Sequence, residues 1–193
     1  MDDESKKHIT ETITLHRKMI AELQESCIDT LAAAAEAITR ALKQNGCLYI
    51  CGNGGSAADA QHIAGELVGR FERERRALPA VALTTDTSVI TSISNDYDYK
   101  NVFARQVEAL VGESDILWAI STSGASANII AAVELAKKKG ACVLAFTGKS
   151  NSRLEHMADI CFCADSKSAA RSQEMHQLAY HIISDLVEQS FCR

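Results

Sequence analysis

The spacing of apolar positions changes near residue 46 and divides the chain into two parts. Before this point apolar residues recur at helical spacing, which predicts one helix over about residues 6–24 and a second over about residues 28–42. Asn45-Gly46 predicts the end of the second helix, because both residues tolerate the left-handed conformation. This arm, residues 1–45, is too apolar for a solvated extension and has no strand to cover, so we expect it to pack against another subunit.

After Gly46, short apolar runs alternate with helical segments. Five runs are nearly continuous in apolar residues, at 47–51, 80–83, 116–120, 142–146 and 160–163. Such runs are typical of parallel strands that are covered on both faces. Helical segments lie near 57–70, 101–111 and 126–139, and a last amphipathic helix includes Met175 and Leu186. The sequence predicts an α/β fold, a three-layer sandwich with a five-stranded parallel sheet, in which 46–193 form the core of one domain spanning 1–193.

Composition and charge exclude several classes of protein. Of the 193 residues 47% are hydrophobic, and 20 basic side chains face 25 acidic ones for a net charge of −5, which argues against nucleic-acid binding. Glutamates interrupt the basic run 70–76, so we expect a solvated helix end there. No run has the length of a membrane span and the N-terminus has no signal-peptide core, so we expect no membrane contact. The seven cysteines are odd in number, which favours core residues of a cytoplasmic protein.

Two loops follow predicted strands and open helices, which is where α/β proteins bind small molecules. The first, residues 52–56, is rich in glycine, and we call it the glycine loop. It matches neither the dinucleotide-binding nor the ATP-binding pattern. The second, residues 121–126, holds four hydroxyl residues at a helix N-terminus, and we call it the hydroxyl loop. A serine-rich helix cap needs only one hydroxyl, so we favour a phosphate cradle.

His62 and Glu66 lie four residues apart on the helix that follows the glycine loop, so they share one face. An imidazole and a carboxylate placed in this way can bind a divalent metal or share acid–base catalysis. From the residues alone, His176 and His181 in the last helix are expected to be structural, and Asn95-Asp96 is expected to be an ordinary turn.

Three motifs resemble the sugar isomerase (SIS) superfamily and, within it, the bacterial phosphoheptose isomerases that act on sedoheptulose 7-phosphate. They are residues 51–62 (CGNGGSAADAQH), 120–124 (ISTSG) and 171–176 (RSQEMH), and the likeness covers nearly the whole chain, arm included. Two positions depart from the family, since Ala125 stands where asparagine is usual and Ser172 where isoleucine is usual.

The resemblance implies a flavodoxin-like sheet, a cytoplasmic homotetramer with active sites at subunit interfaces, and one Zn²⁺ per subunit. It implies catalytic roles for Glu66 as general base and His181 as general acid. The implied metal ligands are His62, Glu66, Gln173 and His181. The implied substrate contacts are Asn53, Gly54, Gly55, Glu66, Asn95, Asp96, Ser121, Thr122, Ser123, Ser126 and Gln173.

The activity implied is conversion of D-sedoheptulose 7-phosphate to D-glycero-D-manno-heptose 7-phosphate through an enediol, the first step toward activated heptose for lipopolysaccharide. Two alternatives are a noncatalytic SIS-domain regulator that binds the replication initiator DnaA and a sugar-phosphate-sensing module. Neither needs a base and an acid, so Glu66 and His181 favour the enzyme.

The spacing of Gln173 and His181 leaves their relation open. Eight residues of one helix rise about 12 Å, and helical spacing alone would pair Gln177 with His181. The implied ligand set works if the helix starts near Gln173, if both side chains lean toward one point, or if different subunits supply different ligands.

Overall fold

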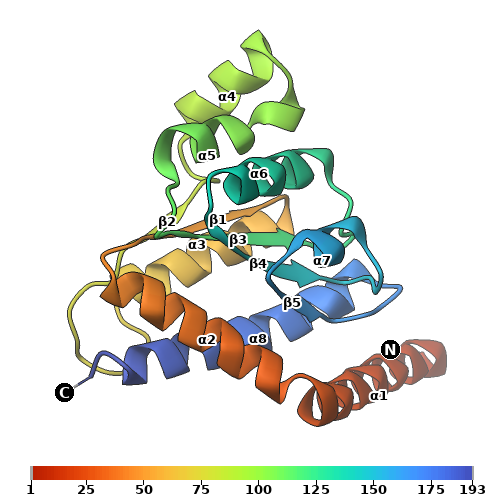
Figure 1. Ribbon diagram of the computed structural model, residues 1–193. Helices are drawn as coiled ribbons and strands as arrows, with labels where there is room; N and C mark the ends of the chain where they lie inside the picture. Colours follow the sequence, from red (N-terminus) through yellow and green to blue (C-terminus); the bar gives the residue numbers. More distant parts are fainter. Residues whose placement is uncertain (1, 193) are drawn as a thin grey trace.

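Five parallel strands form the centre of the protein in a computed structural model that describes residues 2–192. The strands are β1 (Leu48–Gly52), β2 (Ala80–Ala82), β3 (Ile116–Ser121), β4 (Cys142–Thr147) and β5 (Ile160–Cys163). Their order across the sheet is β2-β1-β3-β4-β5, as Figure 1 shows. This is the flavodoxin-like order, and its switch point lies between β1 and β3, where the chain crosses from one side of the sheet to the other. The predicted fold class is confirmed.

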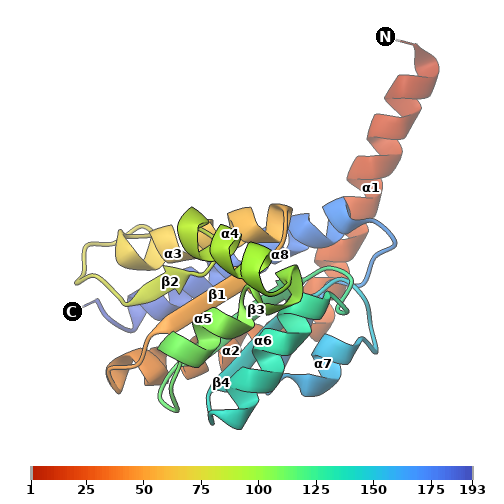
Figure 2. The same cartoon turned by 90° about the horizontal axis from the view of Figure 1, so that it is seen from above.

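Helices cover both faces of the sheet (Figure 1). On one face lie α2 (Ile28–Lys43), α3 (Gly55–Val68) and α8 (Ala169–Gln189). On the other lie α5 (Ala104–Leu110), α6 (Ala127–Lys138) and α7 (Arg153–Met157). Two further elements, α4 (Thr87–Asp96) and the 3₁₀ turn η1 (Tyr99–Asn101), connect β2 to α5. The first helix, α1 (Asp3–Ser26), projects away from the body (Figure 2). Helix α2 instead packs on the sheet and on α8 of its own chain, so the expectation that all of 1–45 packs against another subunit was wrong for α2.

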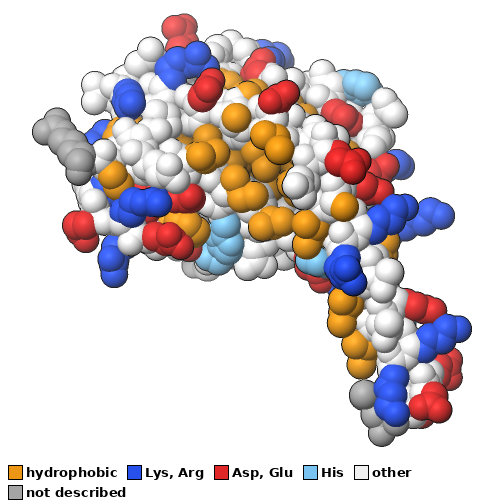
Figure 3. All heavy atoms as spheres, turned by 90° about the horizontal axis from the view of Figure 1, so that it is seen from below, with side chains coloured by type: hydrophobic (Ala, Val, Ile, Leu, Met, Phe, Trp, Pro, Cys, Tyr) orange, Lys and Arg blue, Asp and Glu red, His pale blue; other side chains and the backbone are white. Residues whose placement is uncertain are grey.

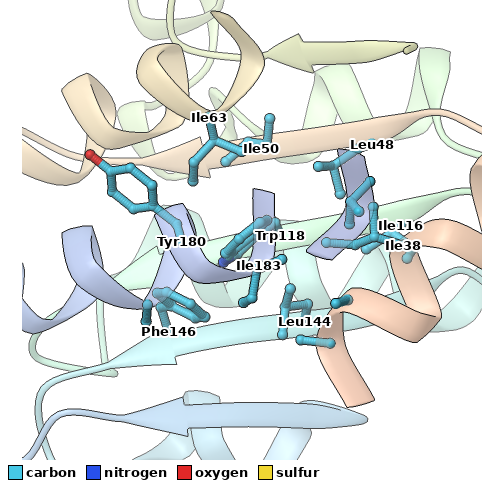
Figure 4. Close-up of a cluster of buried hydrophobic side chains, with 14 of the residues drawn as sticks. Ile38, Leu48, Ile50, Ile63, Ile116, Trp118, Leu144, Phe146, Tyr180 and Ile183 are labelled. Carbon is cyan, nitrogen blue, oxygen red and sulfur yellow. The ribbon is translucent and has the colours of Figure 1, made fainter. Parts of the chain in front are cut away.

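The larger apolar core lies between the sheet and α2, α3 and α8 (Figure 4). Trp118 of β3, Ile50 of β1 and Ile183 of α8 are buried within it. Full burial of a large apolar side chain contributes about 1.5–3 kcal/mol. Tyr180 belongs to the same cluster, but its hydroxyl points out of it toward the edge where α3 and α8 meet (Figure 4). The core therefore fixes α3 and α8 against one sheet and against each other.

Most predicted elements lie where the apolar pattern placed them, and three segments differ. Asn45 has φ 64 and ends α2 as expected. Helix α3 ends at Val68, so the basic run 70–76 is an irregular segment and the expectation of a solvated helix end was wrong. The helices α4 and α7 were not predicted, because each is short and carries few apolar residues. Between residues 2 and 192 no helix is long and apolar enough to span a membrane.

Candidate functional site

Helices α3 and α8 run side by side in the same direction, which brings distant parts of the sequence together. Gly54, with φ 56, turns the chain from β1 into α3, a conformation that glycine adopts without strain. At this end Gly55 faces Gln173, and seven residues further along each helix His62 contacts Tyr180. The two equal steps of seven residues show that the helices stay in register over two turns.

At the second of these contacts His62, Glu66 and His181 converge, and we call these three residues the seam cluster. Nε2 of His62 lies 2.9 Å from Oε1 of Glu66 and 3.4 Å from Nε2 of His181. All three side chains offer ligand atoms within 4.8 Å of one another, the one such group of His, Cys, Asp or Glu found in residues 2–192. The side chain of His62 is 43% exposed and that of Glu66 19%, so the cluster is open to a ligand from one side. The structure thus joins two helices that the sequence separates by more than a hundred positions.

The donor set of the seam cluster fits a divalent cation. The Tyr180 hydroxyl lies 2.9 Å from Nδ1 of His62, so a proton on Nδ1 can be donated to the tyrosine oxygen. This leaves the lone pair of Nε2 pointing toward Glu66 and His181. In a tetrahedral zinc site, bonds of about 2.0–2.1 Å place two imidazole nitrogens about 3.3 Å apart. The separation of 3.4 Å between His62 and His181 agrees with such a site.

The electrostatic surroundings of the cluster include one carboxyl that sequence reasoning missed. Burial raises the pKa of Asp59 to about 6, against the opposing effect of His62. Its Oδ2 is buried and makes no hydrogen bond to the residues the structure describes. Burial and then the neighbouring His62 lower the pKa of His181, while Glu66 raises it. Burial, Asp59 and Glu66 all raise the pKa of Tyr180, which stays protonated. The spacing of Asp59 and His62, three residues apart on one helix, was the signal available in the sequence.

Gln173 does not join the seam cluster within this chain. Its amide lies against Gly55 and leaves no room there for a Cβ. Helix α8 begins at Ala169, so the helix does not start at Gln173, and the side chain leans toward the beginning of α3 rather than toward His181. Of the three arrangements considered from the sequence, the one with ligands from different subunits stays a prediction.

The hydroxyl loop follows β3 and gathers its serine side chains at one point. Oγ of Ser121 lies 3.3 Å from Oγ of Ser123 and 3.1 Å from Oγ of Ser126. Ser126 is the N-cap of α6, yet its side chain makes no capping hydrogen bond. The three hydroxyls therefore gather at the N-terminus of α6, where the helix N–H groups and the helix dipole favour an anion.

A cavity of about 880 Å³ adjoins the hydroxyl loop. Thr122 and Ser123 line it, together with Lys149 and Lys167, and the side chains of α1 form its opposite wall. None of the three residues of the seam cluster lines this cavity. This cavity therefore belongs to the hydroxyl loop, the loop after β4, the start of α8 and α1, and does not reach the seam cluster.

Asn53 is held by two residues that sequence reasoning missed. Its amide and that of Asn128 donate to each other's oxygen at 2.9 and 2.8 Å, and the Tyr99 hydroxyl donates to the Asn53 oxygen at 2.9 Å. Asn128 is buried in the first turn of α6, two residues after Ser126. A polar residue at a buried helix position was the available signal. This pairing fixes the direction in which Asn53 presents its amide beside the glycine loop.

Asn95 and Asp96 are the last two residues of α4, so the expected turn is a helix end. Both are exposed, and the Asn95 amide donates to Asp96 Oδ1 at 2.8 Å. Their contact with substrate stays a prediction.

Comparison with known proteins gives one consistent family. Residues 13–148 match the SIS domain family. The phosphoheptose isomerase of a Roseiflexus species is 51% identical over 83% of this chain and 81% of its own length. That of a Nitratiruptor species is 45% identical over 96% of this chain and 99% of its own. The structure of a phosphoheptose isomerase from Francisella tularensis superposes with a TM-score of 0.92 and 38% identity, covering 96% of this chain and 98% of the other.

Proposed function

The chain belongs to the phosphoheptose isomerases of the SIS domain family, and we propose that its seam cluster carries out the aldose–ketose isomerisation. The reaction converts D-sedoheptulose 7-phosphate to D-glycero-D-manno-heptose 7-phosphate and supplies heptose for lipopolysaccharide. The single observation that carries the proposal is the convergence of Glu66 and His181, from helices far apart in the sequence, on His62. A noncatalytic regulator or a sugar-phosphate sensor needs no such convergence of base and acid.

The proposed mechanism moves one proton between neighbouring carbons. The Glu66 carboxylate removes the proton from C1, beside the C2 carbonyl, while His181 protonates the carbonyl oxygen, and an enediol results. Glu66 then returns the proton to C2, while His181, which has given up its own proton, takes the proton of the C1 hydroxyl, and the aldehyde of the aldose results. The Glu66 side chain is 19% exposed, so solvent reaches the carboxylate and the proton it carries can exchange with water during the reaction.

We propose that His62, Glu66 and His181 hold a Zn²⁺ ion, with Gln173 supplied by another subunit. When bound, such an ion stabilises negative charge that develops on the substrate oxygens. Glu66 has two carboxylate oxygens, so one can face the ion while the other faces the substrate carbon.

We propose that the hydroxyl loop binds the 7-phosphate. The phosphate is remote from C1 and C2, so this contact contributes binding and orientation without touching the reacting atoms. The glycine loop, Asn53 and the end of α4 complete the proposed substrate contacts, as the resemblance implies.

The proposed assembly is a homotetramer with active sites at subunit interfaces. Helix α1 exposes large apolar side chains, among them Ile9, Ile13 and Ile20, and Figure 3 shows an apolar row along it that continues onto the body. Ile13→Asp should shift the protein to smaller assemblies in light scattering, whereas Thr14→Asp, on the same exposed helix, should shift it less. An Ile13→Asp protein with unchanged mass would contradict the role of α1.

The proposed location is the cytoplasm. All seven cysteines are free, which suits a reducing compartment. Cell fractionation checks this, and recovery with secreted proteins would contradict it.

Turnover of sedoheptulose 7-phosphate with and without a chelator tests the proposed function. We expect product from the metal-loaded protein, loss of turnover after chelation and recovery on adding Zn²⁺. Metal-loaded protein that binds the sugar phosphate without converting it would support the sensing module instead, and binding of DnaA without turnover would support the regulator.

A further inference from the structure

The irregular segment between α3 and β2 is held by one buried carboxylate that the mechanism does not use. Glu188, near the end of α8, is completely buried. Its Oε1 accepts the backbone N–H of Phe71 at 2.8 Å, and its Oε2 accepts those of Glu72 and Arg73 at 2.7 Å each. Three successive N–H groups that donate to one carboxylate fix the start of this segment against α8, and we call this set of contacts the carboxylate clamp.

Arg75 extends this clamp to the end of α3. Its side chain is fully buried, with Nε 3.4 Å from Oε1 of Glu188. Its guanidinium donates to the carbonyl oxygens of Glu66 at 2.7 Å and Gly69 at 2.8 Å. A guanidinium at these carbonyls satisfies orphan acceptors of the last helical turn and suits the negative end of the helix dipole. Arg75 thereby connects the two residues, by an ion pair to Glu188 that includes no hydrogen bond from Nε and by a hydrogen bond to the backbone of Glu66.

The same segment also touches the other catalytic group. The ring of Phe71 lies 5.6 Å from that of His181, centroid to centroid. The backbone N–H of Phe71 is one of the three that Glu188 accepts. Glu188 lies seven residues beyond His181 on α8. It therefore contacts the neighbours of both proposed catalytic groups, Phe71 beside the acid His181 and Arg75 beside the base Glu66.

The groups around Glu188 require a negative charge. Burial alone would raise its pKa, but the N–H groups of Glu72, Arg73 and Phe71, together with Arg75, bring the pKa below the ordinary value. Every neighbour in this set is a hydrogen-bond donor. A glutamine at this position would point its own NH₂ group at donors and leave part of the set unpaired.

We propose that Glu188 is a positioning residue of the isomerase site, which sets Glu66 through Arg75 and His181 through Phe71. This inference rests on the catalytic roles proposed for Glu66 and His181. The buried end of α8 would then fix where the Glu66 base and the His181 acid lie relative to each other.

The test compares Glu188→Gln with Asp185→Asn in the full-length, assembled protein. Asp185 forms an ion pair with Arg73 on the same segment and helix, but both side chains are partly exposed. We expect Glu188→Gln to lower kcat about 10- to 100-fold and to weaken Co²⁺ binding, followed by the visible absorption of the metal, by a similar factor. KM should change less than about threefold, because the hydroxyl loop lies outside the region that Glu188 holds. Asp185→Asn should match the wild type in all three.

A second variant keeps the proposal testable if Glu188→Gln fails to fold, as judged by circular dichroism. Phe71→Leu leaves the carboxylate clamp in place and removes the aromatic ring from His181. We expect it to fold normally and to lower kcat about tenfold at unchanged KM.

Wild-type kcat and Co²⁺ affinity in folded Glu188→Gln, or wild-type kcat in Phe71→Leu, would overturn the proposal. An equal rise in KM and fall in kcat would also overturn it, since that is the effect of general loosening. Glu66→Gln, measured in parallel, distinguishes a failure of the proposed mechanism from a failure of the positioning role of Glu188. If Glu66→Gln retains turnover, the proposed mechanism fails; if it is inactive while Glu188→Gln is normal, only the positioning role fails.

Discussion

The seam cluster and the hydroxyl loop serve the same proposed substrate with opposite kinds of side chain. The seam cluster brings together two imidazoles and a carboxylate, and the pKa of His181 is lowered by burial and by His62 and raised by Glu66. The hydroxyl loop offers only neutral hydroxyls and the N-terminus of α6. Groups that gain and lose protons can take part in a proton transfer, whereas fixed dipoles can only hold an anion. We therefore expect the seam cluster to carry out the proton transfer and the hydroxyl loop to bind the phosphate.

The largest expected effect is at the seam cluster. Glu66→Gln keeps the shape of the side chain but removes the base, so kcat should fall about 1,000-fold while KM stays within about threefold. Steady-state kinetics on the assembled enzyme measures both. Glu74→Gln, an exposed glutamate on the neighbouring segment, is the matched control and should be fully active. If Glu66→Gln raised KM and left kcat near the wild-type value, the catalytic base would be another residue.

His176, five residues before His181 on the same helix, sharpens the comparison because it lies outside both sites. It is completely buried and its Nε2 lies 2.9 Å from the Thr147 carbonyl oxygen, to which it donates. Burial lowers its pKa from the ordinary 6.5 to about 4. Between pH 6.5 and 4 this histidine is protonated in the unfolded chain but neutral in the folded chain. The free energy of unfolding therefore falls as the pH falls through this range, and His176 accounts for about 3 kcal/mol of the loss.

Urea unfolding at several pH values measures this loss. In His176→Gln, which does not titrate, the loss between about pH 6.5 and 4 should be smaller than in the wild type by about that amount. Equal pH dependence in the two proteins would mean that His176 is not held neutral.

The smallest expected effect is at the hydroxyl loop. Ser123→Ala removes one of several hydroxyls, so KM should rise about tenfold while kcat changes less than about twofold. Ser190→Ala, an exposed serine at the end of α8, serves as the control. A fall in kcat with unchanged KM would reverse the division of roles between the two regions.

The apolar pattern was sufficient for the sheet and for the helices that cover it, because continuous burial leaves a continuous apolar run. It could not supply α4 and α7, which bury few side chains, nor the irregular path of 70–76, whose shape depends on Glu188 at the far end of the chain. Tertiary hydrogen bonds of this kind leave no local periodicity.

In the site, His62 and Glu66 followed from helical spacing, because they share one helix. His181 came only from the resemblance, since its partner residues lie more than a hundred positions away. Tyr180, Asp59 and Asn128 were missed, although each is a polar group at a position that helical spacing would have buried.

The most direct test of the account follows the proton itself. Wild-type enzyme and Glu66→Gln are incubated with sedoheptulose 7-phosphate in D₂O, and deuterium at C1 and C2 is measured by NMR. A carboxylate base that shares its proton with solvent predicts deuterium in the product of the wild type and none in substrate or product exposed to Glu66→Gln. Deuterium incorporation by Glu66→Gln at the wild-type rate would contradict the claim that the seam cluster holds the base.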